Sequence, residues 1–176
     1  MKLFFGLGNP GKEYDNSRHN LGQMIIKHFV ETRQNGSLLN KSKLQSQLCE
    51  INHNIFAIST EYMNLSGTSV QKVAAFYKIT PENIYIIHDD LDLPVGEWRL
   101  QFDRGPAGHN GVKSTIENLG TQAFWRIRIG IGHPKQSEAP FDGVEDYVLK
   151  PFTPEEKIKI LSLINELTLE KIQHRQ

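Results

Sequence analysis

Short apolar runs alternate along this chain with stretches of helical periodicity, and this alternation restricts the fold more than any other feature. Residues 2–8 and 84–87 are short, largely apolar runs, as buried strands are. Val70, Val73, Ala74 and Tyr77 instead recur at helical spacing. Strands that alternate with helices predict an α/β fold, with a mostly parallel or mixed sheet covered by helices on both faces.

The last third of the chain holds the clearest helix start. Thr153-Pro154-Glu155-Glu156 is a capping box with proline at the first helical position. We expect the helix that follows to bury one apolar stripe, formed by Ile158, Leu161, Ile164, Leu167 and Ile172. Residues 132–152 are predicted to be a loop, because they contain Pro134, Pro140, Gly143 and Pro151.

Length and composition are those of one soluble domain that spans residues 1–176. The single cysteine, Cys49, excludes an intramolecular disulfide and a cysteine cluster for zinc. No apolar run approaches the roughly 18 residues that a membrane-spanning helix needs. The apolar run at residues 3–5 is too short for a secretory signal, so we expect a cytoplasmic protein.

The charges balance overall but not locally. The chain has 20 basic and 20 acidic residues, so its net charge gives no indication of a nucleic-acid partner. Residues 99–135, however, hold six basic and two acidic residues, a local net charge of +4. This segment is either a phosphate-binding surface or a solvated face, and charge alone does not separate the two.

The ligand site of an α/β sheet lies in the loops that follow the carboxyl ends of its strands. In this chain Asn9 and His19 follow the first apolar run, Asn64 follows the strand predicted at residues 54–60, and Asp89 follows the run at residues 84–87. His109 and Asn110 lie in a glycine-rich loop further on. These are the positions at which the rule places a ligand site.

Several well-known motifs are incomplete. Residues 6–11 match G-x-G-x-x-G, but no helix opens on these glycines, as a dinucleotide fingerprint requires. His88-Asp89-Asp90 ends a strand as a Walker B motif does, yet the chain has no P-loop, and its seven histidines lack the spacing of metal ligands. The motif G-x-S-x-G is absent and Cys49 lies within a predicted strand, which argues against a covalent hydrolase.

What remains is a set of asparagine, histidine and aspartate side chains at loop starts, which suits direct attack by water. In such a site a histidine takes the proton, an aspartate fixes its tautomer and asparagine amides bind a carbonyl.

Alternatives stay open for two segments. Asp89 and Asp90 can form a polar turn or helix cap, and residues 105–111 can be a tight turn with Asn110 as the N-cap, or a loop whose backbone approaches an anion.

Six ordered segments give the strongest indication of function. They are residues 6–11 (GLGNPG) with Glu13-Tyr14, residues 18–20 (RHN), 62–67 (YMNLSG), 88–94 (HDDLDLP), 108–111 (GHNG) and 126–134 (RIRIGIGHP). Together they resemble bacterial peptidyl-tRNA hydrolase along nearly all of the chain. The resemblance implies a single three-layer α/β/α domain around a twisted mixed, mostly parallel sheet.

The resemblance also implies an activity. It is hydrolysis of the ester that joins a peptide, or an N-blocked amino acid, to the 3′-terminal ribose of tRNA, with no metal and no cofactor. Peptidyl-tRNA is then the partner, and we expect a monomer with no obligate protein partner and no membrane association.

By the same resemblance, His19 is the general base on the attacking water, and Asp89 stabilises and orients it. Asn9 separates blocked from free aminoacyl-tRNA. The other substrate contacts are Asn64 and Asn110, which hold the substrate and the water, and Tyr14 and Tyr62, which contact the terminal nucleotide and adjoining substrate.

Arg128 is the closest match to a phosphate clamp of the family, and Arg104 and Lys113 are further candidate phosphate contacts. Family members often carry a lysine where this chain has Gln101, so a rearranged clamp that uses Arg104 is expected. The alternative for Arg128 is an ion pair with a carboxylate inside the protein. Two other classes of function also stay open, a non-enzymatic RNA-binding relative and a general small-ester hydrolase.

Overall fold

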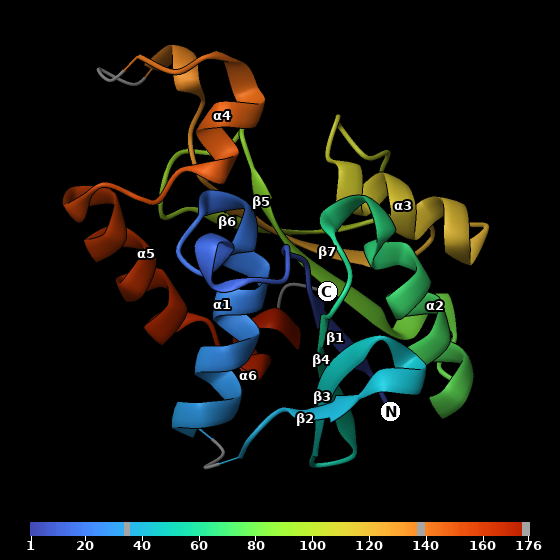
Figure 1. Ribbon diagram of the computed structural model, residues 1–176. Helices are drawn as coiled ribbons and strands as arrows, with labels where there is room; N and C mark the ends of the chain where they lie inside the picture. The colour runs from blue at the N-terminus through green and yellow to red at the C-terminus, as the bar shows by residue number, and fades with distance from the viewer. Residues whose placement is uncertain (34–35, 137–139, 174–176) are drawn as a thin grey trace.

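One mixed sheet organises the computed structural model, which describes residues 1–33, 36–136 and 140–173 (Figure 1). Its strands lie in the order β2 (Leu39–Lys41), β3 (Ser46–Ile51), β4 (Asn54–Ser59), β1 (Leu3–Gly6), β5 (Ile84–Asp90), β7 (Trp125–Gly130) and β6 (Trp98–Phe102). Parallel pairs join β4 to β1, β1 to β5 and β5 to β7. Antiparallel pairs add β3 and β2 at one edge and β6 at the other.

Helices cover both faces of this sheet. On one face lie α1 (Leu21–His28), α4 (Gly143–Leu149), α5 (Pro154–Glu166) and α6 (Leu169–Gln173); on the other lie α2 (Ser66–Tyr77) and α3 (Asn110–Leu119) (Figure 1). The predicted α/β fold with a covered mixed sheet is confirmed. None of the helices in the described part of the chain is long and apolar enough to cross a membrane.

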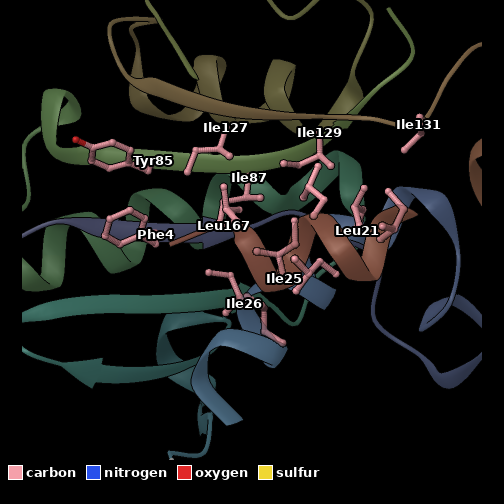
Figure 2. Packing of buried hydrophobic residues seen from close by; sticks show 14 of the residues in the cluster. Phe4, Leu21, Ile25, Ile26, Tyr85, Ile87, Ile127, Ile129, Ile131 and Leu167 are labelled. Atoms are coloured by element: carbon pink, nitrogen blue, oxygen red, sulfur yellow. The ribbon is translucent and has the colours of Figure 1, made fainter. Parts of the chain in front are cut away.

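The central strand β5 shows why the sheet has two cores. Its alternate side chains divide between the faces, with Ile84 and Ile86 in one apolar cluster and Tyr85 and Ile87 in the other. Figure 2 shows part of the second cluster, where Phe4 stacks on Tyr85. Because both faces are covered, the strand is apolar throughout up to its carboxyl end, where polar residues begin.

Glycines bring α1 unusually close to the sheet. A Cβ atom on Gly6 would overlap the carbonyl oxygen of Gly22, and one on Gly22 would overlap the carbonyl oxygen of Ile87. Any side chain at either position would push α1 away from β1 and β5. The contact therefore fixes the start of α1, and with it the 3₁₀ turn η2 (Arg18–Asn20), beside the end of β5.

The loop predicted at residues 132–152 is only partly correct. The segment contains η7 (Pro134–Gln136) and the helix α4, and residues 137–139 lie outside the described part. Pro140 and Pro151 flank α4 without interrupting it, so they were compatible with a short helix. Tyr147 and Val148 are buried, and this burial stabilises a helix that is too short to be stable by propensity alone.

The capping box at Thr153 is confirmed, because Thr153 and Glu156 exchange both capping hydrogen bonds. The apolar stripe predicted after it is wrong in part, since Ile158 is 70% exposed and Leu161 is 43% exposed. The chain offers two apolar faces at helical spacing, and tertiary packing selects the one formed by Ile160, Leu163, Ile164 and Leu167. The helix also breaks after Glu166, and a separate α6 follows.

Candidate active site

A cavity of about 770 Å³ opens at the carboxyl ends of the parallel strands. Its walls come from the loop after β1, the 3₁₀ turn η5 (Met63–Leu65), the end of β5, residues 106–110 and helix α4. The sheet topology brings these segments together, because parallel strands all end at the same edge. The site therefore lies where the strand-end rule places it.

At the base of the cavity, Asp89 holds the ring of His19. The Nδ1 atom of His19 lies 3.0 Å from each carboxylate oxygen of Asp89. Asp89 is only 3% exposed and is the penultimate residue of β5, the strand that pairs with β1. Since a carboxylate accepts, Nδ1 carries the proton, and the lone pair of His19 is on Nε2. That is the tautomer a general base needs.

His109 is a second histidine on the same carboxylate. Its Nε2 lies 2.9 Å from Oδ1 of Asp89, while its Nδ1 accepts from the backbone N–H groups of Gly111 and Val112 at 3.2 and 3.3 Å. The two backbone donors require a lone pair on Nδ1, so the proton is on Nε2 and is donated to Asp89. His109 is thus the N-cap of α3, and Asn110, the N-cap in one of the two alternatives for this loop, is instead the first helical residue.

The charges of this cluster stabilise one another. Burial alone would raise the pKa of Asp89, but His19 and His109 more than reverse this and hold it well below its usual range. Burial lowers the pKa of His19, but the charge and hydrogen bond of Asp89 outweigh burial, so the pKa lies above its usual value of 6.5. The pair therefore combines an aspartate whose ionised form is favoured with a histidine whose pKa is raised.

A third histidine, His88, stays neutral beside them. Its Nδ1 donates to the backbone oxygen of Asp89 at 2.7 Å, and its ring meets the ring of His109 edge to face. Burial, followed by the proximity of His109, lowers its pKa to about 3. His88 also lines the cavity, but its Nε2 atom is buried and has no hydrogen-bond partner among the described residues.

The ligand atoms of His19, Asp89 and His109 lie within 4.8 Å of one another, close enough to suggest a metal site. The hydrogen bonds argue against that use. A metal on Nε2 of His109 would force a proton onto Nδ1, which would then face two backbone N–H donors. The donor set fits a hydrogen-bonded triad and does not fit a metal ion.

Asn9 presents only one kind of hydrogen-bonding group to the cavity. Its side-chain oxygen accepts from the backbone N–H of Met63 at 2.7 Å, and its backbone is held by two 2.8 Å hydrogen bonds with the side chain of Asn20. The described residues give its Nδ2 group no partner. Asn9 is thus a rigid donor at the end of β1.

Comparison with known proteins identifies the family. A model of the family described as peptidyl-tRNA hydrolase matches residues 3–173. The chain belongs to the peptidyl-tRNA hydrolase family. It is 42% identical to the peptidyl-tRNA hydrolase of Lactobacillus acidophilus, over 89% of this chain and 83% of that protein. It is 46% identical to that of Geobacillus thermodenitrificans, over 93% of this chain and 87% of the relative.

A solved structure supports the same assignment. The crystal structure of peptidyl-tRNA hydrolase from Acinetobacter baumannii superposes with a TM-score of 0.84 at 34% identity, covering 98% of this chain and 87% of that one. The three-layer architecture described above is therefore the architecture of the peptidyl-tRNA hydrolase family.

Seven side chains predicted for the peptidyl-tRNA hydrolase site line the single cavity described here. They are His19, Asp89, Asn9, Tyr14, Tyr62, Asn64 and Asn110. His109 was placed near the ligand site by the sequence, but its role on the carboxylate of Asp89 was not predicted. The available signal was its place just before a helix, where a side chain that accepts from the first turn is favoured.

The three candidate phosphate contacts, Arg104, Lys113 and Arg128, lie outside the cavity lining. Arg128 is 5% exposed, and its Nε donates to Asp90 at 2.6 Å. A second nitrogen of Arg128 donates to Gln101, whose oxygen also accepts from Arg104 at 3.0 Å. The structure thus supports the internal ion pair for Arg128. Lys113 is 65% exposed, 4.0 Å from Glu117.

Proposed function

We propose that this protein hydrolyses the ester between a peptide, or an N-blocked amino acid, and the 3′-terminal ribose of tRNA, using a water molecule that His19 activates. The observation that carries the proposal is the orientation of His19 by both oxygens of Asp89, which leaves Nε2 as the basic nitrogen. Membership of the peptidyl-tRNA hydrolase family supplies the substrate class.

The reaction needs no covalent intermediate with the protein. Nε2 of His19 takes a proton from water, and the oxygen of that water attacks the ester carbonyl carbon. Asp89 stabilises the imidazolium that forms. When the tetrahedral intermediate collapses, the ester C–O bond breaks and the ribose hydroxyl leaves with the proton from His19. We assign Asn64 and Asn110 to holding the substrate and the water, as amide donors in an oxyanion site do.

Asn9 explains how a blocked substrate is separated from a free aminoacyl-tRNA. With its oxygen occupied by Met63, its side chain offers only N–H donors to the cavity. A peptide carbonyl accepts such a hydrogen bond, whereas an α-ammonium group carries donors only and leaves Asn9 unpaired.

Two tyrosine rings are available to contact the 3′-terminal nucleotide of the tRNA. Tyr62 is 54% exposed at the mouth of the cavity, and Tyr14 lines it as well. An exposed aromatic ring beside a single-stranded end can stack on a base, which contributes about 1–3 kcal/mol. We propose that these two rings contact the 3′-terminal nucleotide.

One experiment separates the proposal from its two alternatives. Purified protein is given N-acetyl-aminoacyl-tRNA and, separately, p-nitrophenyl acetate, with the His19→Ala variant as the control. The proposal expects His19-dependent release of the N-acetyl-amino acid from tRNA and little turnover of the simple ester. Binding without turnover would indicate a non-enzymatic RNA-binding relative. Equal turnover of both esters would indicate a general small-ester hydrolase.

The proposed substrate also suggests where and in what form the enzyme works. Peptidyl-tRNA is a product of translation, so we propose a cytoplasmic enzyme. We also propose that the functional unit is a monomer. Scattering-coupled gel filtration with and without tRNA tests the second point, and a stable dimer would contradict it.

A further inference from the structure

Arg18, the residue before His19, has one of the largest fully buried side chains in the described structure. Only 1% of it is exposed. A buried guanidinium group is strongly destabilising unless its charge and most of its donors are satisfied. The groups that surround it therefore show which parts of the molecule it holds together.

One side of the guanidinium group binds the end of α4. Its NH1 nitrogen donates to the backbone oxygen of Pro151 at 2.8 Å and lies 3.3 and 3.4 Å from those of Lys150 and Tyr147. The backbone N–H of Arg18 also donates to Lys150 at 3.0 Å. A positive charge at these carbonyls complements the negative end of the helix.

The other side of the guanidinium group binds the start of α5. Its NH2 nitrogen lies 2.7 Å from the carboxylate of Glu156, which at the same time accepts from the backbone N–H of Thr153 in the capping box. The group also lies over the rings of Tyr147, Phe152 and Phe141, with centroid distances of 4.2, 5.4 and 5.6 Å. One side chain thus joins the turn of His19 to two helices.

Helix α4 is the wall of the cavity that differs most from the others. It contributes mainly apolar residues, Val144, Val148 and Leu149, with Glu145, whereas residues 106–110 and η5 contribute both polar and apolar residues. In Figure 1, α4 and α3 stand on opposite sides of the carboxyl end of β5. The largely apolar wall formed by α4 is therefore suited to the acyl part of the substrate.

We propose that Arg18 is a positioning residue that holds α4 at the distance from His19 at which the cavity binds the acyl side chain. This inference rests on the proposed function. Backbone contacts already join the turn of His19 to the segment after α4, through the Arg18 N–H bond to Lys150 and the bridge between Ser17 and Pro151. The guanidinium group adds the side-chain hydrogen bonds to Lys150 and Pro151. Without the guanidinium group, the α4 wall moves while the Asp89–His19 bond remains.

The test compares two acyl groups on one tRNA body, N-acetylphenylalanine and N-acetylglycine. In Arg18→Met, which keeps the apolar stem but loses the donors, we expect the preference in kcat/KM for the phenylalanyl substrate to fall roughly tenfold, an ordinary contribution for an apolar pocket. We expect this loss to appear as a higher KM for the phenylalanyl substrate. For the glycyl substrate, kcat stays within about twofold of wild type and the acid limb of the pH profile does not shift. Arg99→Met, at an exposed arginine of β6, is the matched control.

Arg18→Lys keeps the charge but lacks the two guanidinium nitrogens that reach α4 and α5. We therefore expect an intermediate loss of the preference for the phenylalanyl substrate. This variant decides the question if Arg18→Met does not fold. Hydrogen exchange provides a readout besides activity, and we expect faster exchange over residues 143–149 and unchanged exchange over α3.

Equal losses with both acyl groups, a shifted pH profile or unchanged protection of α4 would overturn the role of Arg18. Failure of the wild-type protein to hydrolyse either substrate would instead overturn the proposed function.

Discussion

At the scale of single residues, the site depends on which nitrogen of each histidine carries a proton. His19 and His109 both donate to Asp89, from Nδ1 and Nε2 respectively. His109 is fixed in this tautomer by two backbone donors, so it cannot accept the proton of a water molecule on that side. His19 is left as the base.

Replacing His19 by alanine tests this assignment. We expect kcat to fall about 10²- to 10⁴-fold, the usual contribution of a positioned general base, with tRNA affinity nearly unchanged. His53→Ala, in an exposed turn, is the control. If His19→Ala keeps more than about a tenth of wild-type turnover, His19 is not the general base.

The pH profile follows from the same pair. Because Asp89 holds the pKa of His19 above 6.5, activity decreases as the pH falls through that pKa and His19 becomes protonated. In Asp89→Asn the carboxylate charge is lost and burial remains, so the acid limb shifts to lower pH while kcat falls. A kcat–pH titration of both proteins checks this, and an acid limb that stays in place or moves to higher pH would contradict it.

Asn9→Ala should reduce discrimination more than stability. The variant removes the donor that faces the cavity, so the ratio of kcat/KM for N-acetyl-aminoacyl-tRNA over free aminoacyl-tRNA is expected to fall. Parallel assays with both substrates measure the ratio, and Asn40→Ala on the exposed edge strand is the control. If the ratio is unchanged, selectivity comes from another part of the site.

At the scale of elements, His109 has two separable tasks. It caps α3 through Nδ1 and binds Asp89 through Nε2. His109→Ala loses both, with an expected cost of about 1 kcal/mol for the cap and a lower kcat. His109→Asn keeps a good N-cap and loses the bond to Asp89, so it should restore thermal stability but not kcat, which we expect about tenfold below wild type. Recovery of both quantities in His109→Asn would show that the cap alone matters.

At the scale of the whole molecule, the basic charges lie outside the catalytic cavity. None of the described residues that line it is lysine or arginine. Contacts with tRNA phosphates must therefore form on the surrounding surface, where Arg104 and Lys113 are more accessible than Arg128. Only a few phosphates are neutralised by such a surface, so we expect a log–log salt slope of roughly −2 to −3.

Charge reversal separates the two arginines. Arg104→Glu should raise KM for full-length substrate and flatten the salt slope by about one unit, with little effect on a substrate that carries only the terminal nucleoside. Arg128→Glu places a second carboxylate against buried Asp90, so we expect a loss of about 3–5 kcal/mol in the free energy of unfolding and similar effects on both substrates. If Arg128→Glu has normal thermal stability and a higher KM only for the full-length substrate, Arg128 binds a tRNA phosphate.

The sequence by itself determined the strands and the residues that follow them. β1 and β5 are recognisable because strands covered on both faces must be apolar throughout, and the change to polar residues marks their carboxyl ends. His19, Asp89, Asn9 and Asn64 follow such ends, so the strand-end rule placed them near the ligand site, and the resemblance to the family supplied their roles.

The tertiary structure decided what depends on contacts between distant segments. Helix α5 has two faces at helical spacing, and only packing against the sheet buries Ile160 and leaves Ile158 in solvent. Arg128 alternates along β7 as a surface residue would, and only the pairing of β7 with β5 places it against Asp90. His109 reaches Asp89 because α3 starts beside β5. Arg18 binds the backbone oxygen of Tyr147 in α4, although the two residues are 129 positions apart in sequence. Periodicity describes one element at a time, whereas these contacts join segments whose separation no local pattern encodes.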